Sequence, residues 1–310
     1  MRRNIILLVV LFSICAVAFC FLLKLPDNSA RKAAHCRYPL ALAIGSQTMV
    51  LQPKRIISLG PSVTKAIYLL GAQDKLIADT VYCIDPPEVK KKEKIGTVTE
   101  VNIEKIFNLK PDLVLATSLT NSKAREKLKN LGVRVITFST LKDFNDICNQ
   151  FLELGRLVDK ENEAKEIVKS VESEIILIKE KVKGLYKPKV FVQMGARPLF
   201  AATGSYFVND YIEFAGGINI AKEARQGIYS REQILKENPD VIIITTMGAM
   251  GMVAEEEKNI WQKYETLSAA KSGRIYIIDT DEITAPTPQS FVKTLADFEH
   301  ILHSGEQNEK

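Results

Sequence analysis

The sequence predicts an α/β protein built from two related lobes with a long helix between them. Short apolar strands alternate with helical segments over residues 53–142 and again over 188–303, a pattern typical of a parallel sheet covered on both faces. A phrase in the first region, NIEKIFNLKPDLVLA (102–116), returns in the second as SREQILKENPDVIII (230–244). We therefore expect one α/β unit to occur twice, with a helical connector between the copies.

Apolar runs and turn residues set the elements of the first lobe. Gly60-Pro61 forms a turn after the first strand, and Ser62 is expected to cap the following helix. The expected elements are, in order, a strand at 55–59, a helix ending near Gly71, a strand at 74–81, a helix and a strand within 102–116, a helix at 121–131 and a strand at 133–139.

The segment between the lobes is predicted to be helical. Asp159 is expected to cap a long helix over residues 161–183, which would span about 34 Å at 1.5 Å per residue. Its apolar residues follow the spacing of one helix face, namely Ala164, Ile167, Val168, Val171, Ile175, Ile178 and Val182. The helix either bridges two lobes or packs within a single domain.

The second lobe repeats the alternation up to the C-terminal region. We expect a strand at 189–195, a helix closed by Gly216-Gly217, the repeated phrase, a Gly/Met loop, a strand at 274–279 and a last helix at 288–303. The predicted organisation is a signal or anchor segment with a linker (1–37), an N-terminal lobe (38–142), a helical connector (143–187) and a C-terminal lobe (188–310).

Each copy of the repeated phrase carries one glutamate in the same place. Glu104 and Glu232 each stand seven residues before the Pro-Asp pair of their copy. Asn102 and Ser230 are predicted N-caps, so both glutamates fall in a first helical turn, where the helix dipole favours an acid by about 0.3–1 kcal/mol. The helix dipole explains each glutamate separately. A partner protein with two basic binding sites would explain why both lobes carry one.

The charge of the chain argues against a nucleic-acid partner. Residues 1–37 hold six of the 42 basic residues and one of the 37 acidic residues, so the remainder is neutral. A nucleic-acid-binding protein needs a concentrated cationic face, which the sequence does not show. Outside the leader, a disulfide among Cys36, Cys83 and Cys148 stays open, because three widely spaced cysteines are not a disulfide framework.

The N-terminal segment predicts that the folded part of the protein is located outside the cytoplasmic membrane. Arg2-Arg3 precede an apolar run at 5–23, whose length lies between a signal-peptide core and a spanning helix. Three fates stay open: cleavage after Ala18, lipid attachment at Cys20, or retention as a helical anchor. VAFC resembles a lipobox, although Phe19 is bulky for one. In each case the body lies beyond the cytoplasmic membrane.

Four stretches together resemble one protein family. They are PKRIISLGPSVTKAIYLLGA, the NIEKIFNLKPDLVLA phrase, SREQILKENPDVIII and GRIYIID. In this order they are similar to the periplasmic binding proteins that capture cobalamin, ferric siderophores or haem for ABC importers. The resemblance covers roughly residues 38–303 and implies two Rossmann-like lobes, one bridging helix, a ligand cleft between the lobes, and docking of Glu104 and Glu232 on arginines of a dimeric permease.

The same resemblance suggests residues that would contact the ligand. They are Tyr82, Gly96, Thr97, Arg197, Tyr206, Arg225 and Tyr229. Each also has an ordinary alternative, such as a loop tyrosine or a solvated arginine. The chain departs from the family at Lys65, where members carry a glutamate, and its only tryptophan, Trp261, lies away from the cleft tryptophans of cobalamin binders. The ligand is therefore expected to be a corrinoid or an iron chelate, without further distinction.

No catalytic residues are predicted. The GPSVT stretch lacks the second glycine of a hydrolase elbow, and no phosphate-binding or dinucleotide-binding glycine motif occurs. No His, Asp or Glu cluster spans both lobes, so we expect no metal site and no catalytic cofactor. The predicted protein is a monomeric binding component that works with an ABC permease dimer and its ATPase subunits; a membrane-anchored ligand sensor on the same fold is the alternative.

Overall fold

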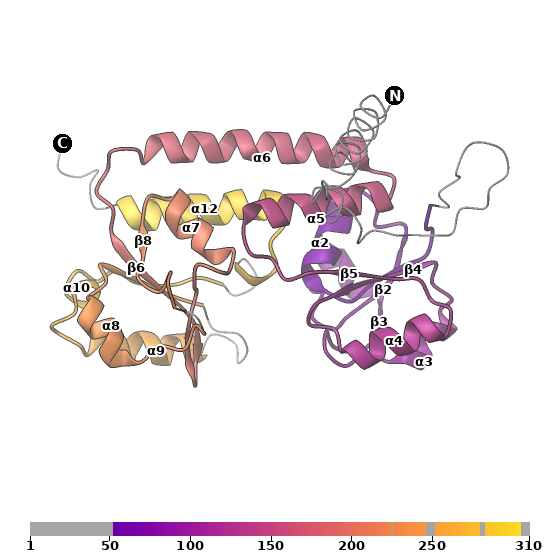
Figure 1. The fold of residues 1–310 in the computed structure, drawn as a ribbon, viewed down its shortest axis with the longest axis horizontal. Helices are drawn as coiled ribbons and strands as arrows, with labels where there is room; N and C mark the ends of the chain where they lie inside the picture. The colour runs from indigo at the N-terminus through magenta and orange to yellow at the C-terminus, as the bar shows by residue number, and fades with distance from the viewer. Residues whose placement is uncertain (1–51, 225, 246–251, 280–282, 305–310) are drawn as a thin grey trace, which may run out of the picture. The chain divides into compact units, whose positions relative to one another are not determined.

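The computed structural model describes residues 52–224, 226–245, 252–279 and 283–304. Figure 1 shows these residues as a ribbon. Within this part of the chain, every helix is too short or too polar to cross a bilayer. The leader with Cys20 and the candidate ligand residue Arg225 lie outside the described residues.

Lobe 1, described over residues 52–142, contains a five-stranded parallel sheet in the order β3-β2-β1-β4-β5. Its elements are β1 (Ile56–Ser58), α2 (Pro61–Leu69), β2 (Leu76–Asp79), a 3-10 turn (Pro87–Lys91), β3 (Glu93–Lys94), α3 (Ile103–Asn108), β4 (Leu113–Thr117), α4 (Ser122–Asn130) and β5 (Val135–Phe138). The predicted order of strands and helices is confirmed in this lobe except for the short edge strand β3, which was not predicted.

Helices cover both faces of the lobe 1 sheet. Val63 and Ile67 of α2 join an apolar cluster on one face, which we call the shared core because it continues into lobe 2. Ile106 of α3 and Leu128 of α4 join a second cluster on the other face. β1 supplies both clusters, with Ile56 on one side and Ile57 on the other, as expected for alternate residues of a strand buried on both faces.

Lobe 2 contains a second sheet, in the order β10-β9-β6-β7, with β8 also paired to β6. All pairs are parallel except that of β6 and β7. Its elements are β6 (Lys189–Ala196), β7 (Leu199–Ala201), α7 (Val208–Phe214), β8 (Ile218–Asn219), α8 (Arg231–Glu237), β9 (Val241–Ile244), α9 (Met252–Gln262), α10 (Ser268–Lys271), β10 (Ile275–Ile277) and α12 (Pro288–His303).

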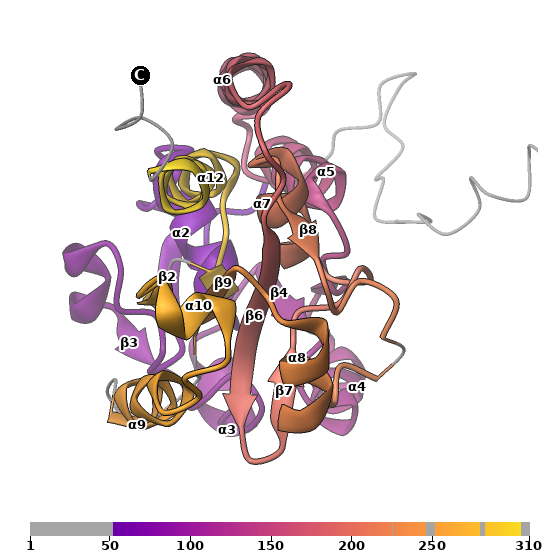
Figure 2. The same ribbon diagram turned by 90° about the vertical axis from the view of Figure 1, so that its left-hand side faces the viewer.

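The lobe 2 sheet has the same two-sided covering. α7 and α12 pack on the face that belongs to the shared core, through Tyr211 and Phe291. α8, α9 and α10 pack on the other face, through Ile234, Trp261 and Ala269. Figure 2 shows α12 and α7 on one side of this sheet, with α8 and α9 on the other.

Two helices connect the lobes, α5 (Phe144–Leu157) and α6 (Glu161–Lys181). α6 spans about 31 Å and packs against α5, α7 and α12, as Figure 1 also shows. Gly155 lets α5 approach α6, because a Cβ there would lie 2.6 Å from the Cβ of Ala164. The two helices bridge the lobes as a pair, since α5 packs against α2 of lobe 1 and α6 packs against α5 and against α7 and α12 of lobe 2.

Two predicted N-caps are wrong and two are confirmed. α2 begins at Pro61 with Gly60 as its N-cap, because the fixed φ of proline suits the first helical position. Asp159 has φ +61° and Lys160 occupies the N-cap of α6, without a side-chain hydrogen bond. Asn102 and Ser230 cap α3 and α8 as predicted.

Aromatic side chains hold the lobes together at the connector. Phe144, at the start of α5, contacts Phe291 of α12 with ring centroids 4.8 Å apart, and Phe291 stacks on Tyr211 of α7 at 4.3 Å. The backbone N–H of Phe144 also donates to Asp210 of lobe 2 at 2.8 Å. Burial raises the pKa of Asp210. At this junction the lobes share a packed core, and a lobe 2 carboxylate accepts the backbone N–H of the first residue of α5.

The repeated Pro-Asp pair does the same structural task in each lobe. The carboxylate of Asp112 accepts the backbone N–H groups of Lys54 and Arg55 at 2.9 Å each, just before β1. The carboxylate of Asp240 accepts the N–H of Lys189, the first residue of β6, at 2.8 Å. Each aspartate thus ties the strand that follows it to the first strand of its own lobe.

Basic side chains and left-handed residues complete the match between the copies. Arg55 donates to the carbonyls of Leu109 and Lys110 beyond α3, and Lys189 donates to that of Glu237 at the end of α8. The residue before each proline is left-handed, with φ +46° at Lys110 and +49° at Asn238. The helices that carry the two glutamates therefore have the same fastening to their sheets.

We expect Asp112→Ala and Asp240→Ala each to lower the free energy of unfolding by about 1–2 kcal/mol, because each removes charge-assisted hydrogen bonds to a strand start. Urea denaturation measures the change. Asp74→Ala, at an exposed turn, is the matched control and should shift the free energy by less than about 0.5 kcal/mol. Equal values for all three variants would contradict the fastening role.

Candidate functional site

The two glutamates occupy the same position in their helices. Glu104 is the second residue of α3, after the N-cap Asn102, whose side chain accepts the N–H of Lys105 at 2.9 Å. Glu232 is the second residue of α8, after Ser230, which forms a capping box with Gln233. Both helices cover the sheet face opposite the shared core. Equivalent elements therefore present one carboxylate each.

Both carboxylates are exposed to solvent. Among the described residues, neither has an ion-pair partner within 4.0 Å. The hydrogen bonds of Glu232 to its own backbone N–H and to Ser230 lower the pKa of Glu232. Glu232 therefore stays ionised in weakly acidic solution. An exposed, unpaired anion at a capped helix end is suited to meet a cation on another molecule.

In lobe 1 the candidate ligand residues lie at one edge of the sheet. Tyr82 follows β2 and is 58% exposed, and Gly96 and Thr97 follow β3. Carboxyl ends of parallel strands lie at the same edge, where α/β proteins bind ligands. The N–H of Val81 donates to the carbonyl of Gly96 at 2.9 Å, so the two loops are joined. The structure thus brings these three predicted residues together.

Gly96 is required by its surroundings. Its φ is +113°, and a Cβ there would lie 2.4 Å from the carbonyl oxygen of Glu100. Thr97 is turned towards the same segment, since its hydroxyl accepts the N–H of Glu100 at 2.9 Å. The geometry of Gly96-Thr97 is therefore that of a tight turn, which leaves backbone rather than side chains available to a ligand at this point.

A buried ion pair anchors the loop that carries Tyr82. The ammonium of Lys94 contacts the carboxylate of Asp79 at 2.6 Å and donates to the carbonyls of Cys83 and Val89. Asp79 is fully buried, and burial raises its pKa although Lys94 opposes the shift. Lys94 is the common partner of both ends of this loop. The loop is thereby held over the end of β2.

Three exposed apolar residues that were not predicted from the sequence lie at the same edge. Val81 and Ile84 flank Tyr82 with exposures of 46% and 49%, and Leu119, after β4, is 69% exposed. Large apolar side chains that stay exposed at strand carboxyl ends mark a surface for an apolar partner. Leu119 stands alone among polar residues in TSLTNS, which is a signal that sequence reasoning could have used.

In lobe 2 the predicted residues do not gather at one place. Arg197 follows β6, and its guanidinium lies 3.9 Å from Glu256 of α9, both being largely exposed. Tyr206 packs on Phe207 and the shared core, with ring centroids 4.4 Å apart. Tyr229 packs on Phe191 in the cluster on the opposite sheet face and donates its hydroxyl to the carbonyl of Ile220 at 3.0 Å. The two tyrosines are thus on different faces.

Both of these tyrosines are neutral in the ligand-free protein. Burial raises the pKa of Tyr206 to about 12, and it also raises the pKa of Tyr229. Both hydroxyls therefore keep their protons at neutral pH.

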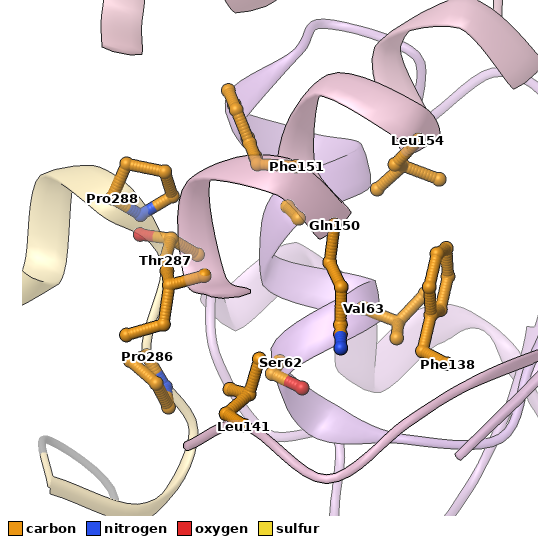
Figure 3. A pocket seen from close by; sticks show the side chains of 12 residues that line it. Ser62, Val63, Phe138, Leu141, Gln150, Phe151, Leu154, Pro286, Thr287 and Pro288 are labelled. Carbon is orange, nitrogen blue, oxygen red and sulfur yellow. The ribbon is translucent and has the colours of Figure 1, made fainter. Parts of the chain in front are cut away.

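A small pocket lies where α2, α5 and the start of α12 meet. Figure 3 shows its lining, in which Phe138, Phe151 and Leu154 face Pro286 and Pro288. Its volume is about 30 Å³, roughly the space of one water molecule. Pockets for small molecules usually measure about 300–1,000 Å³, so this one is a packing gap of the lobe junction.

The cysteines and His303 of the described residues are buried. Over the described ranges, no group of three His, Cys, Asp or Glu side chains is arranged to hold a metal ion. Cys83 and Cys148 are buried free thiols, and Cys36 lies outside the described residues. Burial raises the pKa of Cys148 to about 12. His303 is buried against the carbonyl of Ala215 at 2.8 Å.

Comparison with known proteins decides the family. The model of the family described as Periplasmic binding protein matches residues 56–282. The chain belongs to this family. The ABC transporter substrate-binding lipoprotein YvrC of Bacillus subtilis is 34% identical over 250 residues, which are 78% of each chain.

Two further relatives cover nearly their whole length. The vitamin B12-binding protein of Vibrio parahaemolyticus is 29% identical over 271 residues, 86% of this chain and 96% of its own. A crystal structure of a possible iron-binding periplasmic solute-binding protein from Staphylococcus epidermidis has a TM-score of 0.71 at 28% identity, covering 81% of this chain and 99% of the other. The two-lobed α/β fold of this periplasmic binding protein is therefore shared with its relatives.

In this periplasmic binding protein, we expect Lys94→Met to lower the free energy of unfolding by about 3 kcal/mol, because Asp79 would be left buried without its cation. Amide hydrogen exchange over residues 80–91 should become faster than in the unmodified protein. Lys90→Met, at an exposed position of the same loop, is the control and should change neither quantity. Unchanged exchange in Lys94→Met would contradict the anchoring role.

Proposed function

We propose that this protein is the extracytoplasmic substrate-binding component of an ABC importer, which captures a corrinoid or an iron chelate and delivers it to a membrane permease. Binding is noncovalent and the protein does no catalysis. The ligand is held between the two lobes, and the permease dimer works with ATPase subunits. Membership of the periplasmic binding protein family and the named function of the relatives support this proposal.

The matched carboxylates are the observation that carries the proposal. Glu104 and Glu232 have the same helical position, the same kind of cap and the same fastening of their helices to the sheets. The helix dipole alone would place an acid at either end, but it does not require both to be kept exposed and unpaired. A dimeric permease with one arginine-lined site per subunit would bind these two carboxylates.

The ligand class follows from the lobe 1 edge. Val81, Tyr82, Ile84 and Leu119 offer apolar and aromatic surface, and none of the four carries a charge at neutral pH. Such a surface suits the face of a large ring better than a bare metal ion. A corrinoid agrees with the vitamin B12-binding relative, and a ferric siderophore or haem is the alternative that the iron-binding relative favours. Arg197 would contact acidic groups of either.

The leader would keep the protein at the membrane. Lipid attachment at Cys20 agrees with the lipoprotein relative, and a retained helix would serve the same purpose. A membrane-anchored ligand sensor on the same fold would bind the ligand equally well. It would not need both docking glutamates, so changing them separates the two functions.

We expect Glu104→Lys combined with Glu232→Lys to lower uptake of radiolabelled cyanocobalamin by about tenfold or more, since two cations would replace the anions that face the permease. Uptake by cells that carry the chain and its permease measures the effect. Glu126→Lys combined with Glu265→Lys, one exposed acid from each lobe, is the control with the same charge change. Ligand affinity of the purified double variant should equal that of the unmodified protein, and unchanged uptake would exclude the docking role.

We expect one ligand class to raise the unfolding temperature of the purified protein. Cyanocobalamin, haemin and a set of ferric siderophores are added in turn, and a ligand at one hundred times its Kd should stabilise the folded state by about 2.7 kcal/mol. Tyr82→Ala should weaken the effect of that ligand, whereas Tyr186→Ala, at an exposed tyrosine that follows α6, should not. No shift with any of these compounds would contradict the proposed ligand class.

A further inference from the structure

Each docking glutamate has a cation as its immediate neighbour in the sequence. Lys105 follows Glu104, and Arg231 precedes Glu232. Adjacent side chains of a helix do not face each other, but a long lysine or arginine side chain that is free to move can still approach the carboxylate beside it. It can also repel a cation on an approaching molecule. The two glutamates are useful to a basic partner only if these neighbours are held elsewhere.

In lobe 1 a second acid holds the neighbouring cation. The ammonium of Lys105 pairs with the carboxylate of Glu93 and donates to the carbonyl of Lys94 at 2.8 Å. Glu93 lies in β3, directly before the anchor Lys94. Lys105 is thus drawn towards the edge of the sheet, and Glu104 is left without a cation.

In lobe 2 a different acid, Glu257, holds the cation next to the glutamate. The guanidinium of Arg231 pairs with the carboxylate of Glu257 of α9 at 2.6 Å and lies over the ring of Trp261 at 4.6 Å. Glu257 is buried and also accepts from the side chain of Gln193 at 2.8 Å. Arg231 is therefore held between α8 and α9, and Glu232 is left without a cation.

The two lobes reach this arrangement by unrelated residues. Glu93 comes from a strand before its docking helix, whereas Glu257 comes from a helix after it. The cation stands after the glutamate in one lobe and before it in the other. Repetition of the fold does not account for such a correspondence, because the capturing acids are not equivalent in the repeat.

We propose that Glu93 and Glu257 are positioning residues of the docking surfaces, which capture Lys105 and Arg231 and so keep Glu104 and Glu232 available to cations of the permease. This inference rests on the proposed function. It adds that the strength of docking depends on two acids that do not themselves meet the permease.

The lobe 1 pair gives the cleaner test, because Glu93 and Lys105 are both partly exposed and their substitution leaves the core intact. Uptake of radiolabelled cyanocobalamin is measured for the full-length chain with its permease in four variants: Glu93→Gln, Glu93→Gln with Lys105→Met, Glu104→Gln, and Glu126→Gln. Glu126 is exposed on α4, which contacts α3, so its variant loses the same charge nearby without freeing a cation.

We expect Glu93→Gln to lower uptake by about threefold to tenfold, and the added Lys105→Met to restore it to within about twofold of the unmodified protein. Glu126→Gln should remain within about twofold as well. A role of Glu93 in folding alone would not be rescued by removing Lys105. Either no loss in Glu93→Gln beyond that of Glu126→Gln, or no rescue by Lys105→Met, would overturn the inference.

Glu104→Gln separates the two proposals. If Glu104→Gln lowers uptake and Glu93→Gln does not, docking stands and capture of Lys105 is wrong. If Glu104→Gln leaves uptake unchanged, the docking proposal itself is wrong. In lobe 2, Arg231→Met with Glu257→Gln should give higher uptake than Glu257→Gln alone, and thermal unfolding of both variants shows whether loss of folding contributes.

Discussion

The apolar core that both lobes share is the constraint on which the rest of the structure depends. It runs from α2 and the lobe 1 sheet through α5 and α6 to α7, α12 and the lobe 2 sheet. The ring contacts of Phe144, Phe291 and Tyr211 lie at its centre, where the lobes meet. A core packed at crystal-like density resists deformation, so the lobes are held as one body and not by a flexible tether.

This arrangement divides each sheet into two sides with different tasks. One face builds the shared core, while the other carries the helix with the proposed docking glutamate, α3 in lobe 1 and α8 in lobe 2. Between the faces, the carboxyl ends of the strands supply the loops of Tyr82, Leu119 and Arg197. The proposed contacts with the ligand and with the permease thus use different parts of the same lobe.

Charged side chains fix the positions of the strands, loops and cations around the candidate site residues. Asp112 and Asp240 tie the strands that follow them to the first strand of each lobe, and Lys94 holds the Tyr82 loop over buried Asp79. Each is a charged group with several hydrogen-bond partners, and such groups specify geometry more than they add stability. Lys105 and Arg231 extend this pattern, because their own partners keep them away from the carboxylates that they adjoin.

The sequence by itself determined the order of the main strands and helices, the two lobes, the long connecting helix and the equivalence of Glu104 and Glu232, but not the short strands β3, β7 and β8. The features that it determined follow from local periodicity and from a repeated phrase, both of which can be read without knowing distant contacts. The N-caps Asn102 and Ser230 were predictable for the same reason, whereas Ser62 and Asp159 were not, since proline geometry and a left-handed residue decided those helix starts. Only the tertiary structure decided that Tyr206 and Tyr229 face opposite sides of their sheet, that Val81, Ile84 and Leu119 stay exposed, and that Glu93 and Glu257 take the neighbouring cations. These depend on which segments meet in space, and sequence spacing carries no record of that.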